Sequence, residues 1–230
     1  LDLLYNNFSD EALTHVSEFK TVRALDLRGC VLITDQGIQK LDGMDQLQAL
    51  KIRTYGVTDN GMPTIAGFEN LKVLYLQDVV ITDEGLKSLS GLGNMEDLTL
   101  FGLYGISDEG LSCLAGMPNL KTLSLRDARI NGSCLEHLGG AKNLTQLNIS
   151  ETDVDNAGLA HLKGHTSLEH LDLWLTQIDD AGLAHLEGLT NLKFLSLAQT
   201  QVTNEGLKSL TGLKQLTELN LQESQIDDEG

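Results

Sequence analysis

A short hydrophobic pattern recurs along the whole chain at an almost constant spacing. Written LxxLxL, it begins at Val22, Leu47, Leu71, Met95, Leu120, Leu144, Leu168, Leu192 and Leu216. Successive starts are 24 or 25 residues apart, and Leu1 and Leu3 supply the last two positions of a further, partial copy. A fixed period of this length indicates one structural unit repeated about ten times.

Residues 71–92, LKVLYLQDVVITDEGLKSLSGL, show what one unit contains. Leu74 and Leu76 alternate with residues that face the other way, as in a strand with one buried face. Thr82 lies where a helix N-cap is needed, and Leu86 begins an apolar stripe at helical spacing. Each unit is therefore predicted to be a short strand, a turn and a helix of about two turns.

Two positions, one at the start and one at the end of each predicted helix, recur with the same period. The predicted N-cap position always carries a side-chain oxygen that can accept a hydrogen bond, in Ser9, Thr34, Thr58, Thr82, Ser107, Asn131, Asp155, Asp179, Thr203 and Asp227. A glycine follows most predicted helices, where we expect a left-handed helix stop, at Gly43, Gly67, Gly91, Gly116, Gly140, Gly164, Gly188 and Gly212.

One such unit cannot bury its apolar side chains alone, whereas stacked units share a continuous core and a parallel sheet. The prediction is an α/β solenoid of horseshoe shape, with strands on the concave face and short helices on the convex face. Strands about 4.8 Å apart would make a concave strip roughly 43 Å long. We expect residues 1–230 to form a single array of about ten units, cut within a repeat at both ends.

The repeated segments resemble a known family. Residues 29–41, GCVLITDQGIQKL, and the recurrent ITDEGL resemble the cysteine-containing leucine-rich repeats of F-box proteins. The form LxxLxLxxTQxxxxGLxxL, from Leu168 and Leu192, resembles bacterial leucine-rich repeats, including the GALA effectors and planctomycete arrays. The resemblance implies a horseshoe like that of ribonuclease inhibitor, binding of other proteins, and no catalytic residues.

This chain departs from the cysteine-containing form in most units. The position of Cys30 is aligned with Tyr55, Val79, Leu103, Ala128, Thr152, Thr176, Thr200 and Ser224. The last four are small hydroxyl residues, which we expect to hydrogen-bond the turn backbone.

The composition narrows the range of partners and compartments. The chain carries a formal charge of -17, which argues against nucleic acid and anionic membranes as partners. It has no apolar run long enough to span a bilayer. Only three cysteines and no signal-like opening favour a cytoplasmic location. Fifteen of the 33 acids fall in the three positions that start each helix, where we expect them to complement helix dipoles and remain solvated.

No motif for catalysis or cofactor binding occurs, so neither an enzyme nor a cofactor is predicted. Four potential zinc ligands share one position in successive units: Cys113, His137, His161 and His185. Stacked units would place them in a line and not in a tetrahedron, so no metal site is predicted.

Counted from the first residue of each pattern, the third, fifth and seventh residues are predicted to face the concavity. The residue types at these positions differ from unit to unit, whereas those at the buried positions repeat. Arg, Tyr and Trp, which are enriched at binding hot spots, concentrate there. Phe8, Phe19 and Phe68 map to the core, and Tyr5, Tyr55 and Tyr104 to the turns beside the strip. The predicted partner-binding residues are Arg28, Lys51, Arg53, Tyr75, Gln77, Phe101, Arg126, Asp172, Trp174 and Phe194.

This candidate site is predicted to have two parts. The cationic part, from Arg28 to Arg126, suits an acidic or phosphorylated segment, and Asp172, Trp174 and Phe194 form a less charged patch. The predicted function is a non-catalytic scaffold that binds a protein or peptide on its concave face. The alternative is a substrate-recognition module of a larger protein, either an F-box-type ubiquitin ligase or a bacterial effector.

Overall fold

Nine short parallel strands form one open sheet in which each strand pairs with the next strand in sequence. The computed structural model describes all 230 residues. The strands are β1 (Ala24–Arg28), β2 (Ala49–Arg53), β3 (Val73–Gln77), β4 (Asp97–Phe101), β5 (Thr122–Ser124), β6 (Gln146–Asn148), β7 (His170–Asp172), β8 (Phe194–Ser196) and β9 (Glu218–Asn220). The partial first unit joins the sheet through a parallel bridge between Asp2 and Asp26, so about ten units are stacked.

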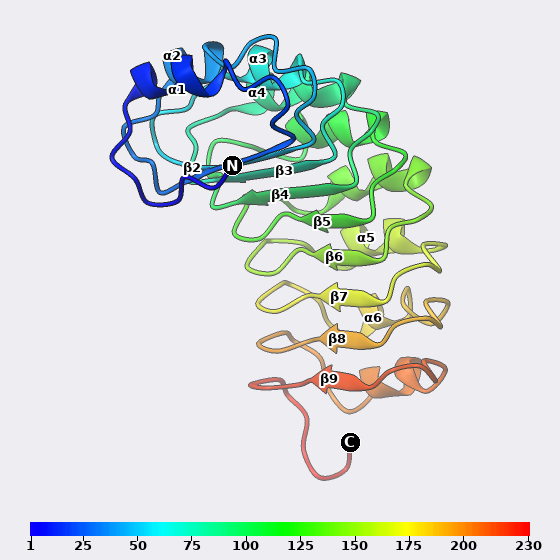
Figure 1. Cartoon of the computed structure of the whole chain (residues 1–230). Helices are drawn as coiled ribbons and strands as arrows, with labels where there is room; N and C mark the ends of the chain where they lie inside the picture. Colours follow the sequence, from blue (N-terminus) through cyan, green and yellow to red (C-terminus); the bar gives the residue numbers. More distant parts are fainter.

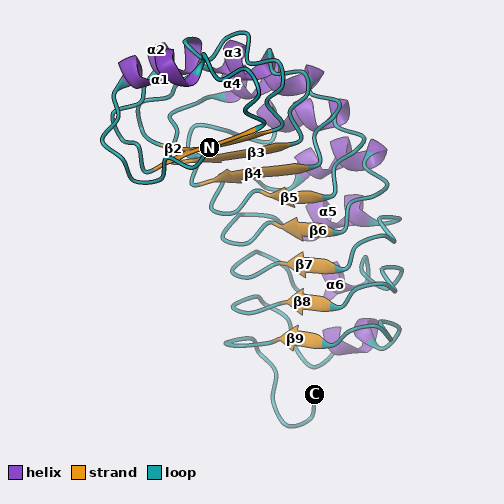
Figure 2. Ribbon diagram, viewed as in Figure 1, coloured by secondary structure: helices purple, strands orange, loops and turns teal.

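Short helices line the other side of the units, and both α and 3-10 types occur. The α-helices are α1 (Asp10–Val16), α2 (Asp35–Gln39), α3 (Met62–Ala66), α4 (Asp83–Lys87), α5 (Asn156–Leu159) and α6 (Asp180–Leu183). The 3-10 helices are η1 (Ser88–Gly91), η2 (Gly110–Gly116), η3 (Ser133–Gly140), η4 (Ala160–Leu162) and η5 (Gly206–Leu210). A helix is about 10 Å wide, whereas strands are about 4.8 Å apart, so the helical side spreads and the stack curves into a horseshoe (Figures 1 and 2).

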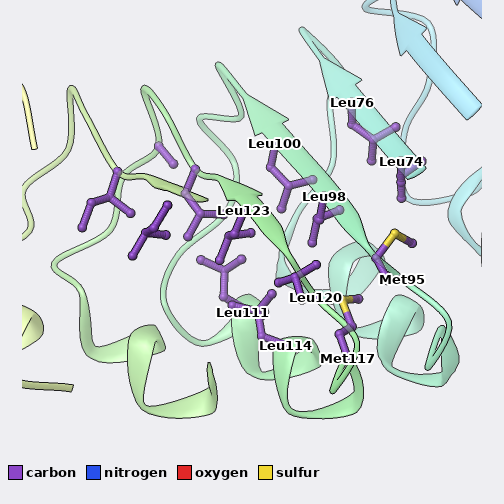
Figure 3. Close-up of a cluster of buried hydrophobic side chains, with 14 of the residues drawn as sticks. Leu74, Leu76, Met95, Leu98, Leu100, Leu111, Leu114, Met117, Leu120 and Leu123 are labelled. Atoms are coloured by element: carbon purple, nitrogen blue, oxygen red, sulfur yellow. The ribbon is translucent and has the colours of Figure 1, made fainter. Parts of the chain in front are cut away.

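The core lies between the sheet and the helices as one continuous cluster of 61 buried residues. Leu74 and Leu76 of β3 and Leu98 and Leu100 of β4 point from the sheet toward the helical side, and Leu111 of η2 belongs to the same buried cluster (Figure 3). All five side chains have no exposed surface. The predicted alternation of inward and outward residues is therefore confirmed, and each unit completes its core only through its neighbours.

At nine of the ten predicted N-cap positions the side chain accepts a hydrogen bond from a backbone N–H two or three residues later. Thr82, for example, accepts a hydrogen bond from the backbone N–H of Glu84 at 3.3 Å. The exception is Ser9, whose side chain caps nothing. The residue is the N-cap of an α-helix, as predicted, at Thr34, Thr82, Asp155 and Asp179. At Thr58, Ser107, Asn131 and Thr203 the helix begins a few residues later. The expected hydroxyl contacts are also present: the side chains of Thr152, Thr176, Thr200 and Ser224 each donate to the carbonyl three residues earlier at 2.6–2.7 Å.

The predicted left-handed helix stops are mostly wrong. Among the eight glycines, only Gly43 and Gly164 have a positive φ, of 75° and 94°. Elsewhere the chain leaves the helix at the following residue, as at Leu92 with φ −80° and ψ 61°. The N–H of Leu92 bonds the carbonyl of Leu89 at 3.0 Å, so a last 3-10 turn ends the helix without a left-handed residue.

Two further positions differ from expectation. Phe19 is 59% exposed, so the core position predicted for it is wrong. After β2, Thr54 and not Tyr55 fills the buried turn position, with exposures of 3% and 75%. No left-handed residue follows β2, so its turn reaches the buried position one residue earlier, and the Thr54 hydroxyl donates to the carbonyl of Ile33 at 3.2 Å.

A series of hydrogen bonds that we call the carboxylate ladder joins the starts of successive helices. At each rung, an Asp at the first helical position of one unit accepts from the capping residue of the next. Asp83 takes both the backbone N–H and the hydroxyl of Ser107 at 2.7 Å. Equivalent rungs join Asp10 to Thr34, Asp35 to Thr58, Asp59 to Thr82 and Asp180 to Thr203. These acids therefore bind neighbouring units together, and the expectation that they are simply solvated is wrong.

The ladder also explains the glycine in ITDEGL. A Cβ atom on Gly85 would lie 2.2 Å from Oδ1 of Asp59, so only glycine leaves room for the carboxylate of the preceding unit. Where the cap is itself acidic, the rung changes to an amide: Asn156 donates to Asp179 at 2.7 Å. An amide in place of the first carboxylate avoids bringing two negative charges together.

Candidate functional site

The predicted binding residues of the first four strands stand side by side on the outer surface of the sheet. The parallel register aligns Arg28 with Arg53 and Lys51 with Tyr75. It also aligns Gln77 with Phe101, so this part of the site is one continuous surface across β1 to β4.

Arg28 is held in place by a carboxylate and an aromatic ring. Its guanidinium contacts both carboxylate oxygens of Asp26, the shorter distance being 2.7 Å, and its central carbon lies 5.3 Å from the centre of the Tyr75 ring. Burial opposes the charged form of Asp26, but the hydrogen bonds from Arg28 outweigh it, so the pKa of Asp26 is below its usual value. The Tyr75 hydroxyl in turn donates to Gln77 at 2.6 Å. This corner of the site is preorganised by its own contacts.

Two other arginines each bond an acid one repeat further along the chain. Nε of Arg53 donates to Asp78 at 2.8 Å, and Nε of Arg126 donates to Glu151 at 2.5 Å. The terminal nitrogens of both guanidinium groups donate to no protein atom. Lys51 makes no ion pair at all. Several donors on the concave face thus remain free for a ligand.

Arg126 joins the two parts of the site that the sequence suggested were separate. Its central guanidinium carbon lies 5.2 Å from the centre of the Phe101 ring and 5.4 Å from that of Trp174. The indole N–H of Trp174 donates to the side chain of Gln199 at 3.1 Å, which fixes the orientation of the ring. The arrangement is an aromatic–cation–aromatic cluster in the middle of the concave strip.

The remaining predicted residues continue the surface toward β8. Phe194 stacks on His170 of the neighbouring strand, with ring centres 3.9 Å apart and planes 3° from parallel. Asp172 accepts from the backbone N–H of Trp174 at 3.1 Å and from the Asn148 amide at 3.3 Å. Asp172 therefore orients its neighbours in addition to carrying charge.

Sequence reasoning missed several supporting residues, namely Asp78, Glu151, His170 and Gln199. A signal for three of them was present. Asp78, Glu151 and Gln199 each lie 25 residues after the site residue that they contact, which is one repeat plus one position. His170 lies 24 residues before Phe194, directly across the register. Comparing each site residue with the same position and the next position one unit away would have found all four.

The column of potential zinc ligands does not converge on a point. Cys113 is 2% exposed, whereas His161 is exposed on the outer side of the array. No group of three His, Cys, Asp or Glu side chains in the structure is placed to hold a metal ion. In addition, none of the helices is both long and apolar enough to cross a membrane.

Comparison with known proteins agrees with this architecture. The model of the family described as Leucine Rich repeat matches residues 20–41, 69–90, 164–186, 188–210 and 214–230. No curated protein matches the sequence.

Two solved structures of Listeria monocytogenes proteins are similar. Internalin C2 is 24% identical with a TM-score of 0.64, and the match covers 94% of this chain and 85% of that one. Internalin InlF is 20% identical with a TM-score of 0.39, and the match covers 96% of this chain and 90% of that one. The likeness to internalin C2 supports the horseshoe fold, and five matched repeats identify the unit from which it is built, so this chain is a leucine-rich repeat protein.

Proposed function

We propose that this protein is a non-catalytic scaffold that binds a protein or peptide segment across its concave face. The binding residues are the ten predicted from the sequence: Arg28, Lys51, Arg53, Tyr75, Gln77, Phe101, Arg126, Asp172, Trp174 and Phe194. Protein binding is the usual role of this fold, because its curvature creates an extended concave surface.

The observation that carries the proposal is the cluster of Phe101, Arg126 and Trp174. Arg126 lies between two rings at 5.2 and 5.4 Å, in the centre of the strip. Arg and Trp are the residue types enriched at interface hot spots, and hot spots cluster near the centre of an interface. A rigid cluster also loses little side-chain entropy when a partner binds.

The charge of the concave face favours an acidic partner segment. The outward strand positions of the first five full units carry four cations and only two acids, in a chain whose net charge is -17. The acids are Asp26 and Asp97. Asp78 and Glu151 in the adjoining turns also pair with Arg53 and Arg126, but each pair uses only one nitrogen of the guanidinium, and the remaining nitrogens can donate to a carboxylate of a partner. A segment that combines Asp or Glu with an aromatic side chain would use both the cations and the partly exposed aromatic rings.

The buried cysteines support a binding role over a nucleophilic one. Burial raises the pKa of Cys113 to about 12 and also raises the pKa of Cys134 and Cys30. The reactive form of cysteine is the thiolate, so these thiols remain protonated and unreactive at neutral pH.

A displayed library of random 16-residue peptides tests the proposal even though the natural partner is not identified. Peptides selected on the wild-type protein are expected to be enriched in Asp, Glu and aromatic residues. Their affinity should fall at least about 30-fold in Arg53→Ala/Phe101→Ala, since each hot-spot loss costs about 2 kcal/mol or more. Arg129→Ala is the matched control, because Arg129 lies over Tyr104 in a turn, outside the strip.

Circular dichroism establishes that each variant is folded. Equal affinity of the selected peptides for the wild type and the double variant would contradict the concave-face proposal. Enrichment of basic peptides would contradict its acidic-partner part.

A further inference from the structure

Exposed apolar side chains gather in the turns that follow the strands. Ten large hydrophobic residues are more than a third exposed, and seven of them lie in these turns. The loops concerned lie together on the left side of the stack in Figure 1, where the strand arrows end. Six of the seven occupy the first five successive units, and we call them the turn ridge: Tyr5, Val31, Leu32, Tyr55, Val80 and Tyr104.

The fold holds two of these tyrosines outward. Tyr55 and Tyr104 are each followed by a glycine that packs against the preceding turn. A Cβ on Gly56 would lie 2.3 Å from the carbonyl oxygen of Ile33, and one on Gly105 would lie 2.4 Å from that of Ile81. The turn backbone is therefore pressed against its neighbour, and the tyrosine, which is 75% or 58% exposed, must project into solvent.

The ridge is also the part of this acidic molecule with the least charge. Its five turns cover residues 5–8, 29–33, 54–57, 78–81 and 102–106, and Asp78 is the only carboxylate or cation among them. Asp78 is already paired with Arg53 at 2.8 Å. With a net charge of -17, most surfaces of two copies repel each other, whereas the ridge turns contain no unpaired acid of their own. Asp127, which lies outside these turns, accepts a hydrogen bond from the Tyr104 hydroxyl at 2.6 Å.

The shape and area of the ridge suit self-pairing. A hollow of about 280 Å³ lies between Tyr5 and Tyr55, so projections and a depression alternate along one strip. Three tyrosines that are 58–75% exposed provide roughly 300–500 Å² of buriable surface. Val31, Leu32 and Val80, each more than half exposed, bring this toward the roughly 800 Å² per partner of a standard interface.

We propose that the turn ridge is a homodimer interface, in which the ridge of one copy packs against the same ridge of a second copy about a twofold axis. Such an isologous contact needs one self-complementary patch, and the ridge provides both its knobs and its hollow. Arg53 lines the hollow at the edge of the ridge, but the other concave-face residues lie outside it. Dimerisation through the turns would therefore leave most of the concave face of each copy open, and a dimer would present two binding surfaces.

Sedimentation equilibrium on the full chain over about 1–500 µM tests the proposal. The wild-type mass should rise from 25.0 kDa toward twice that value. Tyr55→Ser/Tyr104→Ser should raise the half-dimerisation concentration at least tenfold. Both side chains are exposed, so this variant should keep the wild-type thermal unfolding midpoint. Tyr75→Ser/Phe101→Ser, on the concave face, is the matched control and should dimerise like the wild type.

A wild-type chain that stays at 25.0 kDa throughout this range would overturn the proposal. So would a dimer that Tyr55→Ser/Tyr104→Ser leaves unchanged, or one that only the concave-face control dissociates. These outcomes are separate from the fate of the concave-face function, because peptide binding is measured on different residues.

Discussion

Replacing Asn156 with aspartate would place two carboxylates where the structure has an amide and a carboxylate. Nδ2 of Asn156 donates to Oδ1 of Asp179 at 2.7 Å, and Oδ1 of Asn156 accepts from the backbone N–H of Asp179 at 3.2 Å. Asn156→Asp keeps the second contact and turns the first into a repulsion. The variant therefore tests whether this rung of the carboxylate ladder stabilises the stack through charge matching.

The expected cost follows from these contacts. A hydrogen bond to a charged group contributes about 1.5–3 kcal/mol, and that bond is lost. Two carboxylates about 4 Å apart repel by about 1 kcal/mol in water and about 4 kcal/mol at an effective dielectric constant of 20. Both side chains are partly buried but can rotate apart, so we expect a net destabilisation of about 2–4 kcal/mol at pH 7.

Urea unfolding monitored by Trp174 fluorescence measures this cost. Trp174 is the only tryptophan of the chain and lies in the same unit as Asp179. The second variant, Asn156→Asp/Asp179→Thr, recreates the Asp180–Thr203 rung, in which carboxylate oxygens accept at 2.8 and 2.6 Å. It should recover most of the lost stability. The defect of the single variant should also shrink as the pH falls, because repulsion between two neighbouring carboxylates favours protonation of one of them.

The reasoning is refuted if Asn156→Asp is as stable as the wild type at pH 7. It is equally refuted if Asn156→Asp/Asp179→Thr is no more stable than the single variant.

Two further predictions concern buried ionisable groups. Burial lowers the pKa of His165 below 6.5, so the stability contributed by its neutral form is present above about pH 6.5 and is lost as the pH falls below it. His165→Leu should flatten the fall in urea midpoint between pH 7.5 and 5, and Leu189→His, at the same position one unit later, should steepen it; unchanged slopes would contradict this. Cys30, Cys113 and Cys134 are buried with raised pKa values, so an aromatic disulfide reagent at pH 8 should modify none within minutes in the folded protein and all three in urea. Rapid reaction of any thiol in the folded protein would contradict this prediction and show that the residues around that thiol move apart.

The fold could be predicted because packing repeats in the sequence. The positions of Leu74 and Leu76 hold leucine or isoleucine in every full unit, because each unit must fill the same space. The position of Thr82 always holds Ser, Thr, Asn or Asp, because each unit needs a hydrogen-bond acceptor there. The predictions that were wrong depended on local features that the repeated pattern does not show. Phe19 occupies a position that is buried in other units but is exposed in its own, and a stop glycine such as Gly91 ends a helix through a 3-10 turn.

The positions of the proposed binding residues on the sheet were predictable, but the contacts between their side chains were not. Arg126 lies between Phe101 and Trp174, which are 73 positions apart in the sequence. This contact depends on how far each side chain reaches across the neighbouring units. The carboxylate ladder could have been found, because Asp precedes Thr or Ser caps, and Asn precedes the Asp caps at Asp179 and Asp227. The residue type at each rung can therefore be matched to the cap of the next unit in the sequence itself.

The central claim is that the concave cluster of cations and aromatic rings binds an acidic protein segment. Isothermal titration of one selected acidic, aromatic peptide into the wild type, Arg53→Ala/Phe101→Ala and the control Arg129→Ala tests it directly. The account predicts one peptide per chain, wild-type affinity in the control, and an affinity at least about 30-fold weaker in the double variant. A folded double variant that binds the peptide as tightly as the wild type would contradict the account.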